Sequence, residues 1–179
     1  LKPGGEIYFS DVYSDRRIAD DLQADPVLWG ECLSGALYWN DFLKIARKAR
    51  FTDPRSVKNN PITIENDELN EQCGDIQFFS VTYRLFKIDG LEEDCEDYGQ
   101  AVAYKGTIKN NNNAFNLDDH HNFPTGKVIT VCGNTYKMLH DTRFADHFEF
   151  YGSWDTHYGI FEGCEGAMPF NEDIEASCC

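Results

Sequence analysis

The chain opens with a tight turn that leads directly into an apolar strand. Its first five residues read Leu-Lys-Pro-Gly-Gly, and the following run, residues 6–11, carries Ile7, Tyr8 and Phe9 before it ends in Ser-Asp. Proline and glycine mark turns, and an apolar run of this length that ends in polar residues is typical of a strand. The pattern is that of a late strand in a nucleotide-binding type of α/β sheet, so we expect the chain to enter its fold part-way through such a sheet.

The elements that follow fit the end of this sheet. A polar stretch at residues 14–23 is predicted to be helical, and Asn40 is a suitable N-cap for an amphipathic helix that runs to about Arg50. Two β-rich runs come next, at residues 62–64 and 76–86. A strand, a helix and two late strands predict one α/β unit over residues 1–88, in which the last hairpin adds an antiparallel strand.

The second part of the chain has a different texture. Residues 89–97 are acidic and contain glycine, which is typical of a linker. Beyond them, residues 101–104 and 128–131 are expected to be short strands, and residues 136–142 a short helix. We therefore predict a small α+β module over residues 98–179, with a loose tail at its end.

The charge of the chain excludes two classes of partner. The formal net charge is −15 at pH 7, with 31 acidic residues against 16 basic ones. Binding to phosphates requires clustered lysine and arginine, so neither nucleic acid nor an anionic membrane surface is an expected partner. No apolar run approaches the length of a membrane span, so we expect no membrane insertion.

The chain has seven cysteines, and their pattern indicates free thiols. An odd number at uneven spacing is unlike a secreted disulfide scaffold, and the absence of a Cys-x-x-Cys pair argues against a zinc ribbon. Free thiols persist in a reducing compartment, so a cytoplasmic location is predicted.

Two of the cysteines are candidates for chemistry. Cys32 lies between Gly30 and Gly35, just before the predicted helix and near the expected cofactor edge of the sheet. Its alternative interpretation is a small buried hydrophobe, as most free cysteines are. Cys73 falls in the predicted turn before the last strand, where we expect exposure, and an exposed thiol is either reactive or incidental.

Two other clusters have the residue types of a metal site. The run 118–121 reads Asp-Asp-His-His, and carboxylates and imidazoles are good ligands for zinc or iron. Adjacent histidines on a strand point to opposite faces, so the alternative is a structural role. Cys178 and Cys179 form a vicinal pair at the C-terminus, which either captures a thiophilic ion or belongs to an unimportant tail.

Longer stretches of the chain resemble one enzyme family, the arsenite methyltransferases. The resemblance covers nearly the whole chain and is carried by the segments LKPGGEIYFSDVY, VLWGECLSGALYW, FFSVTYRLFK, EDYGQAVAYKGTI, LDDHHNFPTGK, VCGNTYKML, TRFADHF and HYGIFEGC. The WGEC segment is the most discriminating, because other class I methyltransferases lack a cysteine there. The resemblance implies the C-terminal half of a class I (Rossmann-like) methyltransferase sheet followed by a small α+β module, with the glycine-rich cofactor-binding half upstream.

The resemblance also implies an activity and its residues. Family members transfer methyl groups from S-adenosylmethionine to trivalent arsenic held by cysteine thiolates, with a thiol reductant such as glutathione or thioredoxin. Cys32 matches the family's WGEC cysteine and is the expected arsenic ligand. Cys73 is the expected second ligand, although the vertebrate-like members carry a cysteine where this chain has Ile76. The expected partner is arsenite or its thiol conjugate, bound by a monomer, and the piece alone is expected to be inactive.

Two other functions stay open on the sequence alone. One is a class I methyltransferase with another substrate, in which Cys32 only fills space. The other is a thiol-rich module that sequesters soft metals without catalysis. Methyl transfer needs the upstream glycine-rich loop, whereas metal capture by Cys32 and Cys73 does not.

Overall fold

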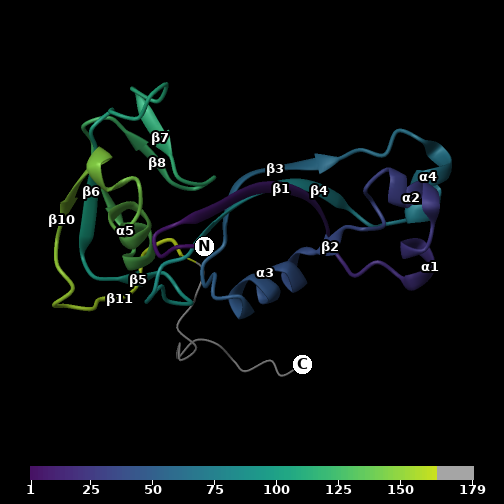
Figure 1. Cartoon of the computed structure of the whole chain (residues 1–179), viewed down its shortest axis with the longest axis horizontal. Coiled ribbons are helices and arrows are strands. Elements are labelled where there is room, and N and C mark those ends of the chain that lie inside the picture. Colours follow the sequence, from purple (N-terminus) through teal and green to yellow (C-terminus); the bar gives the residue numbers. More distant parts are fainter. Residues whose placement is uncertain (165–179) are drawn as a thin grey trace, which may run out of the picture.

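A computed structural model describes residues 1–164 and shows a sheet that joins two groups of elements at opposite ends of the molecule (Figure 1). The sheet has four strands in the order β2-β1-β4-β3. They span Glu6–Ser14 (β1), Leu37–Tyr38 (β2), Arg55–Ile62 (β3) and Phe78–Phe86 (β4). β2 runs parallel to β1, whereas β4 is antiparallel to both of its neighbours. This mixed sheet confirms the predicted α/β class and the antiparallel final strand.

Four helices accompany this sheet. They are α1 (Asp20–Gln23), α2 (Pro26–Gly30), α3 (Trp39–Lys48) and α4 (Asp67–Cys73). α3 buries Phe42 and Ala46 against the sheet, where they meet Tyr13 and Tyr83. The cap prediction is wrong, because β2 runs directly into α3 and the N-cap is Tyr38 rather than Asn40. The helix predicted at residues 14–23 is much shorter, since the first of these residues still belongs to β1.

The second group of elements begins after β4. Its strands are β5 (Glu96–Asp97), β6 (Gln100–Tyr104), β7 (Ala114–Asn116), β8 (Asn122–Pro124), β9 (Val128–Val131), β10 (Phe148–Tyr151) and β11 (Gly159–Ile160). A helix, α5 (Gly133–His140), and a 3₁₀ turn, η1 (Ala145–His147), lie among them. The strands predicted at residues 101–104 and 128–131 are confirmed, and the predicted helix begins three residues earlier than residue 136.

An aromatic core holds this second group together. Phe115, Phe123, Phe144 and Phe148 are all buried in it with Tyr104. The same core includes Phe86, the last residue of β4, so the central sheet continues directly into it.

The acidic segment 89–97 is packed onto this core. Leu91 is buried in the core, and the Glu92 amide donates a hydrogen bond to the Asn134 side chain over 2.8 Å. The domain limits at residues 88 and 98 stay predictions. Within residues 1–164 the longest helix has ten residues, and none is long and apolar enough to cross a bilayer. Cys178 and Cys179 lie outside the described residues.

Candidate functional site

Both predicted arsenic ligands lie at the end of the molecule formed by α1, α2 and α4 (Figure 1). Cys32 follows α2, and Cys73 is the last residue of α4. Leu33, the neighbour of Cys32 in the chain, is buried in the same apolar cluster as Cys73. The fold therefore brings the two cysteines, which are 41 positions apart in the sequence, into one region.

Cys32 is exposed and held in an unusual backbone conformation. Its φ is +62°, in the left-handed region where glycine is the usual residue. The turn closes α2, because the Leu33 amide donates to the Leu28 carbonyl oxygen over 2.9 Å, as in a helix C-cap. A side chain at such a position costs roughly 1 kcal/mol relative to the right-handed region. The interpretation of Cys32 as a buried hydrophobe is wrong, and the strain is a reason to look for a function.

Cys73 is buried, which contradicts the expectation of an exposed turn. It is 4% exposed and packs with Leu28, Leu33 and Phe78. The reason is that residues 67–73 form a helix, α4, capped by the Asn66 side chain, rather than a turn. Burial raises the pKa of the Cys73 thiol, and the nearby Asp25 carboxylate adds to this effect. Cys73 is therefore a neutral thiol at pH 7.

The two segments are held together and flanked by a cavity. The Gln72 side chain of α4 donates to Asp25, the N-cap of α2, over 2.9 Å. A cavity of about 350 Å³ beside them is lined by Glu31, Leu33 and residues 62–66 and 69. The Ser34 hydroxyl, two positions after Cys32, is buried and has no hydrogen-bond partner within the described residues. Buried polar groups are rarely left unpaired, so this hydroxyl is an exception among the described residues.

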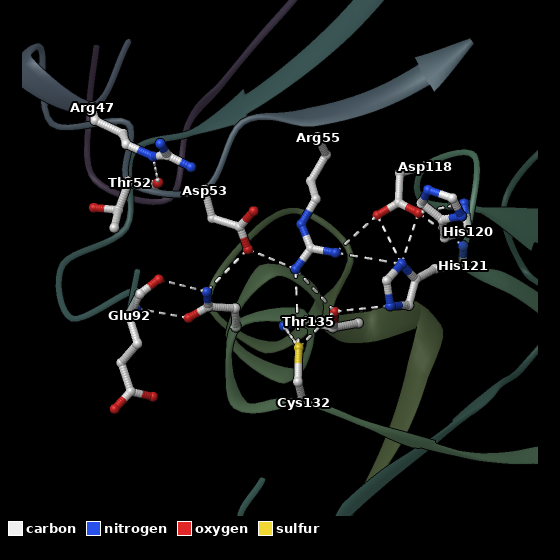
Figure 2. A network of polar contacts seen from close by, with 11 residues as sticks. Arg47, Thr52, Asp53, Arg55, Glu92, Asp118, His120, His121, Cys132 and Thr135 are labelled. Atoms are coloured by element: carbon white, nitrogen blue, oxygen red, sulfur yellow. Dashed lines mark hydrogen bonds and ion pairs between the residues drawn. The ribbon is translucent and has the colours of Figure 1, made fainter. Parts of the chain in front are cut away.

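The Asp-Asp-His-His run has a different role, shown in Figure 2. The Arg55 guanidinium, on β3, donates to Asp118 over 3.2 Å and to Asp53 over 2.6 Å. The His121 ring nitrogen Nδ1 lies 2.7 Å from Asp118, whereas His120 is exposed. Among residues 1–164 no group of three or more His, Cys, Asp or Glu side chains is arranged to hold a metal ion. The run therefore connects the second group of elements to the sheet, which favours the structural alternative.

The charges of this network are set by burial and pairing. Burial opposes the charged form of Asp118, but hydrogen bonding to His121 and the charge of Arg55 outweigh it and lower its pKa to about 2. Burial likewise opposes the charge of Arg55, and Asp53, Cys132 and Asp118 together raise its pKa above the ordinary range. Both groups are therefore ionised at pH 7.

Comparison with known proteins supports the resemblance seen in the sequence. Residues 98–171 match the family model of the arsenite methyltransferase C-terminal domain. An arsenite methyltransferase from Aquipseudomonas alcaligenes is 58% identical to this chain over its whole length. Over its whole length the chain is therefore similar to part of an arsenite methyltransferase. The mouse arsenite methyltransferase is 43% identical over 84% of the chain.

A solved structure confirms the fold prediction. An arsenic(III) S-adenosylmethionine methyltransferase from Chlamydomonas reinhardtii matches 90% of the chain with a TM-score of 0.86 and 51% identity. The chain is thus built as the C-terminal part of a class I methyltransferase. It spans 53% of the bacterial relative, 39% of the mouse relative and 54% of the algal structure.

Proposed function

We propose that this chain is the arsenic-binding part of an S-adenosylmethionine-dependent arsenite methyltransferase, with Cys32 and Cys73 as ligands of the metalloid. The observation that carries the proposal is Cys32, an exposed thiol held in a left-handed conformation beside the cluster that buries Cys73. Its relatives are arsenite methyltransferases, which supports arsenite or its thiol conjugate as the substrate. We further propose a cytoplasmic monomer.

Thiol ligands suit this substrate because trivalent arsenic is soft and thiophilic. When arsenous acid binds two thiols, two As–O bonds are replaced by two As–S bonds, and the displaced hydroxyls leave as water with the thiol protons. Cys73 is neutral before binding, so its proton leaves in this way rather than to bulk solvent. The bound arsenic keeps its third hydroxyl.

The remaining lone pair on arsenic is the nucleophile of the transfer. S-adenosylmethionine supplies an electrophilic methyl group on a sulfonium, and a new As–C bond forms as the C–S bond breaks. Residues 1–164 contain no glycine-rich turn after a parallel strand, the feature that cradles such a nucleotide, so this chain is assigned only the arsenic site. The transfer oxidises arsenic by two electrons, and a thiol reductant such as glutathione or thioredoxin would return them.

The test is an arsenite titration of the 179-residue chain in which Cys178 and Cys179 are both replaced by serine. Bound arsenic is counted by native mass spectrometry, and free thiols by a colorimetric reagent. We expect Cys32→Ser and Cys73→Ser each to remove one bound arsenic, because one thiolate cannot chelate. Cys164→Ser is the matched control. Unchanged arsenic binding in both Cys32→Ser and Cys73→Ser would contradict the proposal.

A further inference from the structure

A second group of cysteines converges at the opposite end of the sheet. Cys95, Cys132 and Cys164 line one cavity of about 590 Å³, together with Arg55 and His121. None of the three belongs to the site proposed above. They come from three separate segments: the residue before β5, the N-cap of α5 and the turn after β11. The sequence presented them only as scattered free thiols.

The backbone explains why Cys95 and Cys164 meet. β5 and β11 pair through Glu96 and Ile160, and the Phe161 amide donates to the Cys95 carbonyl oxygen over 2.7 Å. The Cys164 amide in turn donates to the Phe161 carbonyl oxygen over 3.1 Å. These hydrogen bonds hold the turn at residues 161–164 against the segment that carries Cys95.

Cys132 sits where a thiolate is well stabilised. It is 1% exposed, and its sulfur accepts a hydrogen bond from the Thr135 amide, 3.5 Å away, at the N-terminus of α5. The Arg55 Nη2 atom lies 4.0 Å from the same sulfur. A helix N-terminus and a nearby cation both favour the charged form of cysteine.

Cys132 and Cys95 have pKa shifts of opposite direction. The neighbouring Cys95 thiol is the main cause that lowers the pKa of Cys132, and Arg55 and Thr135 act in the same direction against burial. The Cys132 sulfur, together with burial, raises the pKa of Cys95. A thiolate is therefore favoured at Cys132 and a neutral thiol at Cys95, and both residues line the same cavity.

We propose that Cys95 and Cys132 form a second binding site for trivalent arsenic, separate from Cys32 and Cys73. Two neighbouring sulfurs satisfy arsenic, which tolerates a remaining hydroxyl ligand. Zinc, by contrast, takes four ligands in structural sites, and residues 1–164 offer no arranged group of three. The choice of arsenic over other thiophilic ions rests on the proposed function.

The exchange balances without an oxidant. Arsenous acid loses two hydroxyls as its As–O bonds are replaced by As–S bonds to Cys95 and Cys132. The Cys95 proton leaves with one hydroxyl as water, and the hydroxyl displaced by the Cys132 thiolate takes its proton from solvent. The third hydroxyl stays on arsenic. Arg55 lines the same cavity, and its Nη2 atom lies 4.0 Å from the Cys132 sulfur.

The experiment uses the 179-residue chain with Cys32, Cys73, Cys178 and Cys179 replaced by serine, and inorganic arsenite as the probe. We expect one bound arsenic per chain and the loss of two titratable thiols. Adding Cys95→Ser removes the chelate and should weaken binding by roughly 100-fold or more. Cys164→Ser, in the same cavity, is the matched control and should change the affinity less than about tenfold.

The test uses Cys95→Ser because Cys95 is only half-buried, whereas Cys132 is the buried N-cap of α5 and its replacement endangers the fold. Circular dichroism verifies that each variant is folded. Absence of arsenic from the four-serine variant, or binding that Cys95→Ser leaves unchanged, overturns the second site. The first site is judged separately, in a chain that carries only Cys95→Ser and the two tail substitutions. One arsenic retained there, and lost on Cys32→Ser, supports the first site whatever the result at the second.

Discussion

Arg55 is the residue whose loss should most weaken the connection between the sheet and the second group of elements. It lies at the start of β3 and is 9% exposed, and its guanidinium bridges Asp53 with Asp118 (Figure 2). Arg55→Met keeps much of the side-chain volume but removes the charge and the donors. Asp118 is then left almost fully buried with His121 as its remaining charged or polar side-chain partner in the network.

The magnitude follows from this burial. Removing one partner of a buried ion pair typically costs about 3–5 kcal/mol, because the other charge stays desolvated. We expect Arg55→Met to lower the free energy of unfolding by about this amount at pH 7. Arg17→Met is the matched control: Arg17 pairs with Asp41 over 2.5 Å but is 71% exposed, so its loss should lower the free energy of unfolding far less than Arg55→Met does.

The assay is urea unfolding followed by circular dichroism at pH 7. Asp118→Asn is then added to Arg55→Met, because removing the stranded carboxylate should recover part of the loss. The reasoning is refuted if Arg55→Met and Arg17→Met lower the free energy of unfolding equally. It is also refuted if the double variant is less stable than Arg55→Met by the full cost of Asp118→Asn alone.

Three further predictions concern the backbone and the pH dependence. Cys32→Gly should change the free energy of unfolding by no more than about 0.5 kcal/mol, because relief of the left-handed strain offsets the flexibility of glycine. Cys32→Val should lower the free energy of unfolding by about 1–2 kcal/mol. Urea unfolding measures both. Gly4→Ala should cost about 2 kcal/mol more than Gly126→Ala in the same assay, because both have positive φ but only at Gly4 would a Cβ atom meet backbone, 2.6 Å from the Asp141 carbonyl oxygen. The folded-state pKa of Asp118 lies below its ordinary 3.8, so its contribution of about 2 kcal/mol to the free energy of unfolding is complete above pH 4–5 and is lost as the pH falls towards 2. Asp118→Asn should flatten that part of the curve of unfolding free energy against pH. An unchanged curve would argue against the assignment.

The sequence predicted those elements whose apolar pattern is strong. β4, β6 and β9 alternate or run apolar over several residues, and α3 carries Phe42 and Ala46 on one face. These signals are local, so the sheet end and the small module could be placed without tertiary information.

α4 was missed because its helical signal is weak. Its seven residues read Asp-Glu-Leu-Asn-Glu-Gln-Cys, and only Leu69 and Cys73, four positions apart, turn towards the apolar cluster. Cys73, the last residue of this helix, is followed by Gly74 and Asp75, a run typical of a turn, so the sequence alone predicts an exposed Cys73. The Asn66 cap was the available signal: an asparagine before two acidic residues is a common helix start.

Neither the Arg55 network nor the second thiol cluster can be predicted from neighbouring residues in the sequence. Asp118 is 63 positions from Arg55, and Thr135 is 80 positions away. A buried arginine looks like a surface residue in the sequence until its partners are known, and the cysteines of this cluster share no fixed spacing. Only the tertiary fold assembles such sites.

The helices around Cys73 have a kinetic consequence. α1, α2 and α4 have four, five and seven residues, lengths at which a helix is not stable by itself and depends on packing against its neighbours. Such a segment opens at a lower free energy than the sheet does, as a sub-global unit. Access of a reagent to the buried Cys73 sulfur thus requires this opening, so the rate of capture at that end is set by local unfolding rather than by diffusion of the small molecule. Hydrogen exchange of the α4 amides would follow the same step.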